Sequence, residues 1–278
     1  MVKIGKVNKL KIVKKVEFGL YLDGGELGEI LLPKKYINDD VDIDDFIDGF
    51  IYFDSEDRII ATTKIPFAQV DEFAFLNVVD VSRIGAFLDW GLEKDLFVPF
   101  REQNEKMIRG KSYVVRVYFD DMSNRIAASS KIERFLYLKP VELEENQPVN
   151  MLISHQTDLG FKVIVDNKYP GLLFKNDIFQ TVKIGQSIKG YIKKIRLDGK
   201  IDLSIHPSGY GKIDELSQKI LNILKSNDDY ISVTDESKPE LIYQIFGMSK
   251  KNFKKSIGTL YKQRIISLEE EGIRLIKK

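Results

Sequence analysis

A short phrase built around a glycine occurs three times in this chain and constrains the fold more than any other feature of the sequence. In each copy the glycine is the second residue and most of its neighbours are apolar or aromatic: residues 18–22, 84–88 and 159–163. A basic residue that opens a later apolar segment follows the glycine after 39, 40 and 40 residues: Arg58, Arg125 and Lys200. A near-constant period of this kind indicates one small module built three times.

Up to about residue 206, short apolar segments alternate with turns. Val, Ile, Phe and Tyr dominate the segments, and Gly, Asn and Asp separate them at close spacing, which is typical of small β-barrels rather than of βαβ units. A glycine inside such a strand pattern indicates a bulge or a tight bend. The third copy begins near Val149, after an acidic linker flanked by Pro140 and Pro148. We therefore expect three small barrels in tandem.

The last part of the chain has a different periodicity. Apolar residues between 216 and 224 recur at helical spacing, which predicts a first helix. A second helix has Pro239 in its first turn and ends at Gly247, and a third begins after Ser249, a good N-cap residue. Two short strands close the chain, at residues 265–268 and 273–276. Three helices and a terminal hairpin predict a winged helix-turn-helix.

Composition narrows the possible classes of function. The charges of the 43 basic and 42 acidic residues nearly cancel, so the net charge argues neither for nor against nucleic-acid binding. Only local clusters of charge are informative. The absence of cysteine excludes disulfides and thiolate–metal sites. No apolar run approaches the roughly 20 residues that cross a bilayer, and the first residues enter a strand pattern without a signal-peptide core. We expect a cytoplasmic protein with no membrane partner.

Motifs that carry catalysis are missing from the sequence. It has no Gly-x-x-x-x-Gly-Lys-Ser/Thr phosphate loop and no dinucleotide fingerprint, and it contains two histidines. The aspartates between residues 39 and 48 have the composition of a loop rather than of a nuclease site. We expect a protein that is not an enzyme and that uses no cofactor and no metal.

The motifs resemble two known domain types. The three copies are similar to the RNA-binding repeat of ribosomal protein S-one, whose signature is close to Phe-Gly-x-Phe-Val, Gly-Leu-Val-His and Asp-x-x-Gly-Arg-Ile. With Ser237-Lys238-Pro239-Glu240 and the run from 246 to 262, nearly the whole chain resembles the bacterial conserved virulence factor B family. The resemblance implies a multidomain, mainly β protein with three tandem five-stranded OB-fold barrels and a C-terminal α/β winged helix domain. The implied domains are 1–64, 65–135, 146–207 and 212–278.

In barrels of this type, aromatic residues of the glycine strand stack on bases, and a nearby basic group holds the phosphate backbone. The resemblance implies these RNA-binding residues: Phe18, Tyr21, Arg58, Phe87, Arg125, Lys162, Phe174, Arg196 and Lys200. The first copy matches the signature best, although Pro33 takes the histidine position. In the second copy Trp90 lies just beyond the phrase and would extend the stacking surface. The third copy relies more on charge than on stacking.

Each of these residues also has a structural interpretation. The alternative for the aromatic residues is a place in the barrel cores. The alternative for the basic residues is a solvated position at the start of a strand. Asp54 and Asp121, at the signature's Asp position, suit turn formation better than ligand contact. The acidic loop between 39 and 48 argues against uniform RNA binding, because it would repel phosphate or cover a basic face. Lysines of the first 15 residues form a basic counterpart to this loop.

The third helix of the C-terminal domain is a second candidate site. Its lysines have no acidic residue between 247 and 264: Lys250, Lys251, Lys254, Lys255 and Lys262. Lysines at i, i+4 repel one another unless a polyanion neutralises them, and this helix has the position of a recognition helix. A solvated helix face is the alternative. The acidic residues 269–271 of the wing would repel DNA phosphate, which favours RNA or a protein partner.

Three functional hypotheses follow from these patterns. The first is an RNA-binding regulator whose barrels and winged helix hold single-stranded RNA, with virulence-gene expression as the process that the resemblance implies. The second is a transcription regulator that binds duplex DNA through its winged helix. The third is an adaptor that contacts the ribosome or a polymerase.

Overall fold

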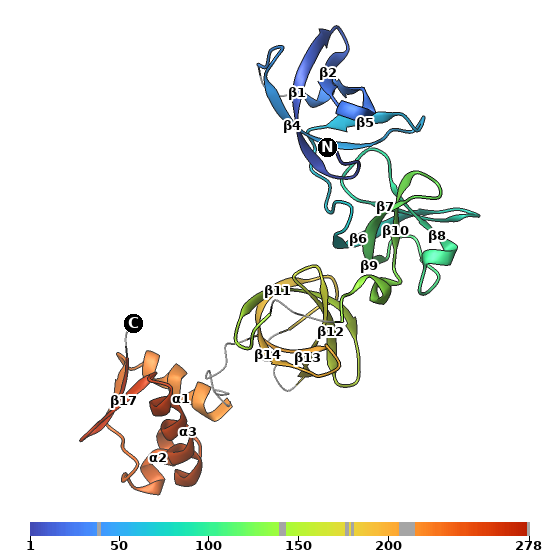
Figure 1. Ribbon diagram of the computed structural model, residues 1–278. Coiled ribbons are helices and arrows are strands. Elements are labelled where there is room, and N and C mark those ends of the chain that lie inside the picture. The colour runs from blue at the N-terminus through green and yellow to red at the C-terminus, as the bar shows by residue number, and fades with distance from the viewer. Residues whose placement is uncertain (38–39, 139–142, 176–177, 179–180, 206–214, 277–278) are drawn as a thin grey trace. The chain divides into compact units, whose positions relative to one another are not determined.

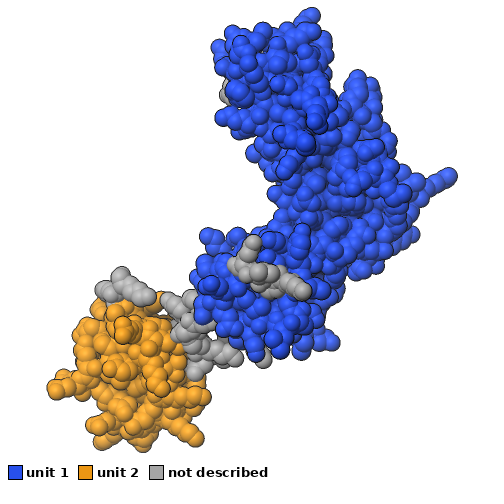
Figure 2. Space-filling model, in the orientation of Figure 1, with its two compact units in different colours: residues 1–205 blue, residues 206–278 orange. Residues whose placement is uncertain are grey.

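The computed structural model describes residues 1–37, 40–138, 143–175, 178, 181–205 and 215–276. The chain divides into two compact units, residues 1–205 and 206–278 (Figures 1 and 2). The first unit is built from strands, and the second combines helices with a small sheet. Some positions used in the sequence analysis lie outside the described residues. They are Pro140 with the two linker residues after it, the predicted domain boundaries at 207 and 212, and the last two residues of the chain.

The first unit contains three closed barrels of five strands each (Figure 1). The first barrel consists of β1 Val7–Val16, β2 Gly19–Asp23, β3 Glu29–Pro33, β4 Phe46–Phe53 and β5 Ile59–Thr62. The second consists of β6 Phe73–Val81, β7 Gly85–Asp89, β8 Leu96–Pro99, β9 Ser112–Asp120 and β10 Arg125–Ser129. The third consists of β11 Pro148–Gln156, β12 Gly160–Val165, β13 Tyr169–Phe174, β14 Ser187–Ile195 and β15 Ile201–Ser204. Short 3-10 helices accompany them: η1 Gly25–Leu27, η2 Lys34–Tyr36, η3 Phe100–Glu102 and η4 Ile132–Phe135.

All three barrels share one topology. In each, the first strand pairs with the second and fourth, and the third strand runs parallel to the fifth. The predicted threefold repetition of a five-stranded barrel is therefore confirmed. Closure leaves no free sheet edge, so a small module can bury its strands without an accompanying helix layer.

The repeated glycine is explained by close packing between two strands. A Cβ atom on Gly19, Gly85 or Gly160 would lie 2.3, 2.3 and 2.0 Å from a backbone carbonyl oxygen of the third strand. The bulge that the glycine suggested lies elsewhere, since the register shifts in the preceding strand, between Ile12 and Lys14 in the first barrel. Each glycine is thus required for the approach of two backbones, not for a bulge of its own.

Apolar contacts join the barrels within the first unit. The indole of Trp90 in the second barrel packs edge-on against the ring of Phe50 in the first, with 5.7 Å between their centroids. Trp90 is 3% exposed, and its ring N–H donates to the carbonyl oxygen of Lys94 at 2.6 Å. A smaller cluster that contains Phe73 and Ile164 links the second barrel to the third. Trp90 is therefore a buried residue of the interface between two barrels, and it also lines the cavity of the second barrel.

The second unit has the predicted winged helix arrangement. Its elements are α1 Glu215–Lys225, β16 Tyr230–Ile231, α2 Pro239–Phe246, α3 Lys250–Lys262, β17 Ile266–Glu269 and β18 Gly272–Leu275. Gly247 ends α2 in the left-handed conformation, at φ 59°, and the Ser249 hydroxyl caps α3 by accepting from the backbone of Asn252. Phe246 and Phe253 pack at 4.8 Å in the core between these helices. Among the described residues, no helix has the length and apolarity needed to cross a membrane.

Candidate nucleic-acid interface

The pairing registers place the three copies on one common frame. Tyr21, Phe87 and Lys162 of the second strands lie opposite Leu31, Phe97 and Leu172 of the third strands. The backbone of Arg58 pairs with Asp54, that of Arg125 with Asp120, and that of Lys200 with Arg196. The residue equivalent to Asp54 is therefore Asp120, not Asp121, because the turn of the second barrel is one residue longer.

In the first barrel, aromatic and basic side chains share one surface. Phe18 is 59% exposed and Tyr21 half-buried, and their rings stand nearly perpendicular with centroids 6.4 Å apart. The Lys14 ammonium lies 5.6 Å from the centre of the Tyr21 ring. The ring of Phe18 and the Lys14 ammonium therefore lie together at the surface, where the ring can contact a base and the cation a phosphate.

Arg58 of this barrel is held by the turn that precedes it. Its guanidinium pairs with Asp54 at 2.7 Å and with Glu56 at 3.0 Å. The Asp54 carboxylate also accepts from the backbone N–H groups of Glu56 and Arg58, so Asp54 is the turn former that the sequence suggested. Partial burial would raise the pKa of Asp54, but the hydrogen bonds from Arg58 and Glu56 outweigh it and lower the pKa.

The second barrel presents the equivalent surface as a cavity of about 560 Å³. Phe87 and Phe97 form its aromatic part, with ring centroids 5.2 Å apart. Apolar, basic and acidic side chains complete the lining, among them Ile84, Pro99, Lys94, Arg101, Asp120 and Arg125. Tyr52 and Phe53 of the first barrel also contribute to it. An apolar wall beside several cations is suited to an unpaired base with its phosphate.

The third barrel has a cavity of about 530 Å³ at the same place. Leu159 and Leu172 supply apolar surface, and three of the predicted cations line it: Lys162, Arg196 and Lys200. The Arg196 guanidinium pairs with Asp202 at 2.6 Å, which raises its pKa, and lies 5.8 Å from the ring centre of Phe174. All three cations have carboxylate partners, since Lys162 pairs with Glu133 at 3.4 Å and Lys200 with Asp198 at 3.2 Å.

The acidic loop of the first barrel contacts the lysines of β1. Lys11 pairs with Asp44 at 2.7 Å and Lys15 with Asp42 at 3.2 Å. The hydrogen bond to Asp44 and its charge raise the pKa of Lys11. The lysines of β1 and the aspartates of the acidic loop therefore partly neutralise each other. Asp39 lies outside the described residues.

In the winged helix, α3 divides its lysines between two roles. The Lys250 ammonium donates to the backbone oxygens of Glu236 and Ser237, at 3.1 and 2.9 Å. Lys254 pairs with Asp235 at 3.1 Å. These two lysines therefore fix the segment before α2 against α3, with acceptors that come from outside the helix.

The remaining lysines of α3 form an exposed stripe. Lys251, Lys255 and Lys262 are exposed, and their spacing places them on the helix side opposite the buried residues Phe253, Ile257 and Leu260. Gly258 lies in the same stripe, and a Cβ atom there would have no neighbour within 4 Å. This lysine stripe is open to a ligand along the described length of the helix.

Comparison with known proteins finds similarity in two of the domains and along nearly the whole chain. Residues 4–64 match the family model of the S1 domain, and residues 218–275 match that of the CvfB-like winged helix domain. Conserved virulence factor B from Staphylococcus aureus strains RF122 / ET3-1 and N315 is 26% identical over 99% of this chain and 95% of the relative. The chain is therefore similar to conserved virulence factor B over nearly its whole length.

Solved structures include a similar chain of the same extent. A multidomain protein with nucleic acid binding domains from Streptococcus pneumoniae is 23% identical, with a TM-score of 0.45, over 98% of each chain. A chain of the a/eIF2alpha–aDim2p–rRNA complex from Pyrococcus horikoshii is 13% identical, with a TM-score of 0.22, over 44% of this chain and 87% of its own.

The structure collects most of the predicted barrel residues into three equivalent surfaces. Sequence reasoning missed several side chains of the second surface, among them Ile84, Lys94, Phe97 and Arg101. One signal was available for Ile84, because the residue before each repeated glycine is apolar or aromatic in the sequence. The structure shows these residues exposed: Phe18 at 59%, Ile84 at 64% and Leu159 at 65%. Lys94 had no such signal, since its position on the cavity depends on how two barrels pack.

Proposed function

We propose that this protein is a cytoplasmic RNA-binding regulator of gene expression that holds single-stranded RNA across the equivalent surfaces of its three barrels. The observation that carries the proposal is the equivalent position, in each barrel, of an exposed apolar or aromatic residue and a cation: Phe18 and Arg58, Ile84 and Arg125, and Leu159 and Lys200. Stacking of a base on an aromatic residue such as Phe18 contributes roughly 1–3 kcal/mol and is available only to unpaired bases, whereas Ile84 and Leu159 offer apolar contact. The proposal includes no catalytic step.

Single-stranded RNA suits these surfaces better than a duplex does. The cavities of the second and third barrels have apolar walls, and a base must leave its partner to contact them. Several weak sites on one chain add up to useful affinity when one strand engages them together. The similarity to conserved virulence factor B supports a role in controlling expression of virulence genes, with a transcript as the target.

Binding of labelled single-stranded RNA, single-stranded DNA of the same sequence and duplex DNA, measured by fluorescence anisotropy at fixed salt, tests the proposal. We expect RNA preference and at least tenfold weaker binding when Phe18→Ala and Tyr21→Ala are combined, because each lost stacking contact costs about 1 kcal/mol or more. Phe46→Ala is the matched control, since Phe46 is also 59% exposed and lies in the same barrel. A preference for duplex DNA that these aromatic substitutions leave unchanged would contradict the proposal.

Duplex DNA is the second candidate ligand, and the lysine stripe of α3 favours it. A helix that presents three cations around a glycine has the form of a recognition helix that lies close to a nucleic-acid backbone. Lys251→Glu combined with Lys255→Glu reverses two of the three charges of this stripe while leaving the structural contacts of Lys250 and Lys254 intact. Loss of duplex binding in that variant, with RNA binding retained, would assign DNA to the winged helix. An adaptor role instead predicts no measurable binding of either nucleic acid.

A further inference from the structure

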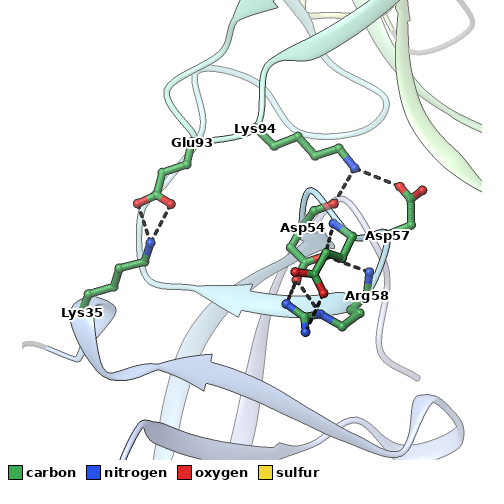
Figure 3. Close-up of polar contacts among 7 residues, drawn as sticks. Lys35, Asp54, Asp57, Arg58, Glu93 and Lys94 are labelled. Carbon is green, nitrogen blue, oxygen red and sulfur yellow. Dashed lines mark hydrogen bonds and ion pairs between the residues drawn. The ribbon is translucent and has the colours of Figure 1, made fainter.

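The turn between β4 and β5 of the first barrel reaches the cavity of the second. The Asp57 carboxylate, in this turn, pairs with Lys94 at 3.0 Å and with Arg125. The Lys94 ammonium also donates to the backbone oxygen of Asp54 at 2.5 Å (Figure 3). Two cations of the cavity in the second barrel are thus bound by one carboxylate of the first.

The Asp57 carboxylate mimics a bound phosphate group. Its oxygens accept from an ammonium and a guanidinium, the same two donors that bind a nucleic-acid phosphate. The hydrogen bond from Lys94, supported by the charges of Lys94 and Arg125, lowers the pKa of Asp57, so the carboxylate is ionised at neutral pH. Its side chain is 43% exposed, so a strand can reach and replace it without unfolding the barrel.

The third barrel repeats this arrangement with a different residue. Glu133 belongs to η4, which precedes the third barrel, and pairs with Lys162 at 3.4 Å on the lining of that cavity. In both cases a carboxylate from the preceding part of the chain neutralises a cation on the candidate surface. Arg58, in the first barrel, is instead paired within its own turn.

We propose that Asp57 is an internal competitor for RNA phosphate, which occupies a phosphate site made by Lys94 and Arg125 until a strand displaces it. The inference rests on the proposed function and adds to it a phosphate-binding residue, Lys94, and a competing group. Displacement leaves the two barrels joined, because the Trp90–Phe50 contact does not involve Asp57. The Lys35–Glu93 pair, at 2.6 Å, is also independent of Asp57 (Figure 3). Asp57 therefore lowers the affinity of this site for weakly bound anions. An RNA strand that also stacks on Phe87 gains enough binding energy to displace the Asp57 carboxylate.

The test is RNA binding by Asp57→Asn. Asp57 has φ 61°, a left-handed conformation that asparagine tolerates, so this substitution removes the charge and keeps the turn. The substitution frees two cations from exposed ion pairs, which are individually weak, so we expect binding about two- to thirtyfold tighter than in the wild type. Asp121→Asn, in the equivalent turn of the second barrel, is the control with the same change in net charge, and we expect less than a twofold effect.

A second set of variants separates competition from general electrostatics. With Lys94→Gln and Arg125→Gln, RNA binding should weaken, and adding Asp57→Asn should then change nothing, because the competitor has lost its partners. Asp57→Gly, which also accepts the left-handed conformation, serves as a second removal of the carboxylate, and Trp90 fluorescence checks that the barrel contact persists.

The outcomes distinguish the two proposals. Wild-type RNA binding that Asp57→Asn and Asp57→Gly leave unchanged or weaken would overturn the competitor and leave the proposed function standing. An equal gain from Asp121→Asn would also overturn it, in favour of a general charge effect. Absence of RNA binding by the wild type and by every variant would overturn the proposed function and the competitor together.

Discussion

Gly85→Ala tests why the repeated glycine is needed. In the wild type, β7 begins at Gly85, and its backbone lies against β8. A Cβ atom at this position would lie 2.3 Å from the carbonyl oxygen of Val98 and 2.7 Å from the Phe97 ring. The first contact is about 1 Å inside the ordinary contact distance of 3.4 Å, and it involves backbone that cannot rotate away. The two strands must therefore separate locally.

The expected cost is that of overpacking a closely packed site, about 1–3 kcal/mol. For a module of this size the urea dependence of the unfolding free energy is near the low end of the usual range, about 1 kcal/mol per M. A loss of about 2 kcal/mol then lowers the urea midpoint of the second barrel by about 2 M. Trp90 is the only tryptophan and is buried in this barrel, so its fluorescence follows that transition.

Gly258→Ala is the matched control, because the same added methyl group meets no atom within 4 Å in α3. Alanine is favoured over glycine inside a helix by about 0.8–1 kcal/mol, so helical circular dichroism should show a higher midpoint for the winged helix. The Trp90 transition should be unchanged. If Gly85→Ala leaves the Trp90 midpoint where it was, the close approach of the two strands is not the reason for the glycine.

Two further predictions concern the cap of α3 and the charges of the turn in the first barrel. Ser249→Ala removes the acceptor for the backbone of Asn252 and should destabilise the winged helix by about 1 kcal/mol, seen as a lower midpoint in helical circular dichroism. Contacts lower the folded-state pKa values of Asp54 and Asp57. The stability that these contacts contribute is therefore fully present above the unfolded carboxyl pKa of about 4, and it is lost as the pH falls through the folded-state pKa values. Trp90 fluorescence measured at stepped pH should show this loss as a loosened contact between the first two barrels.

The barrels were predictable because their signal is local. The phrase around Gly19 recurs at constant spacing, and strand alternation is visible in a few residues on either side of it. Register within a turn was less secure, because an extra residue between β9 and β10 moves the equivalent of Asp54 from Asp121 to Asp120. The conserved spacing to Arg125 concealed this shift.

Contacts between distant segments were not predictable from these patterns. Trp90 is buried by Phe50, which precedes it by 40 residues and belongs to another barrel. Similarly, α3 has no acidic residue in its own sequence, yet Asp235 and the backbone of residues 236 and 237 bind two of its lysines. A charge run in sequence therefore overstates the number of cations open to a ligand, and only the structure separates Lys251 and Lys255 from Lys250 and Lys254.

The competitor in the second barrel has a counterpart whose effect can be ranked in advance. Glu133 contacts one cation of the third cavity, Lys162, at 3.4 Å, whereas Asp57 contacts two cations. One exposed pair contributes up to about 1 kcal/mol, so Glu133→Gln should tighten RNA binding by at most about fivefold, less than Asp57→Asn. The two pairs share no partner, so their effects should multiply in the double variant. A larger effect from Glu133→Gln than from Asp57→Asn, in the same anisotropy assay, would show that the number of cations bound by each carboxylate does not set its strength as a competitor.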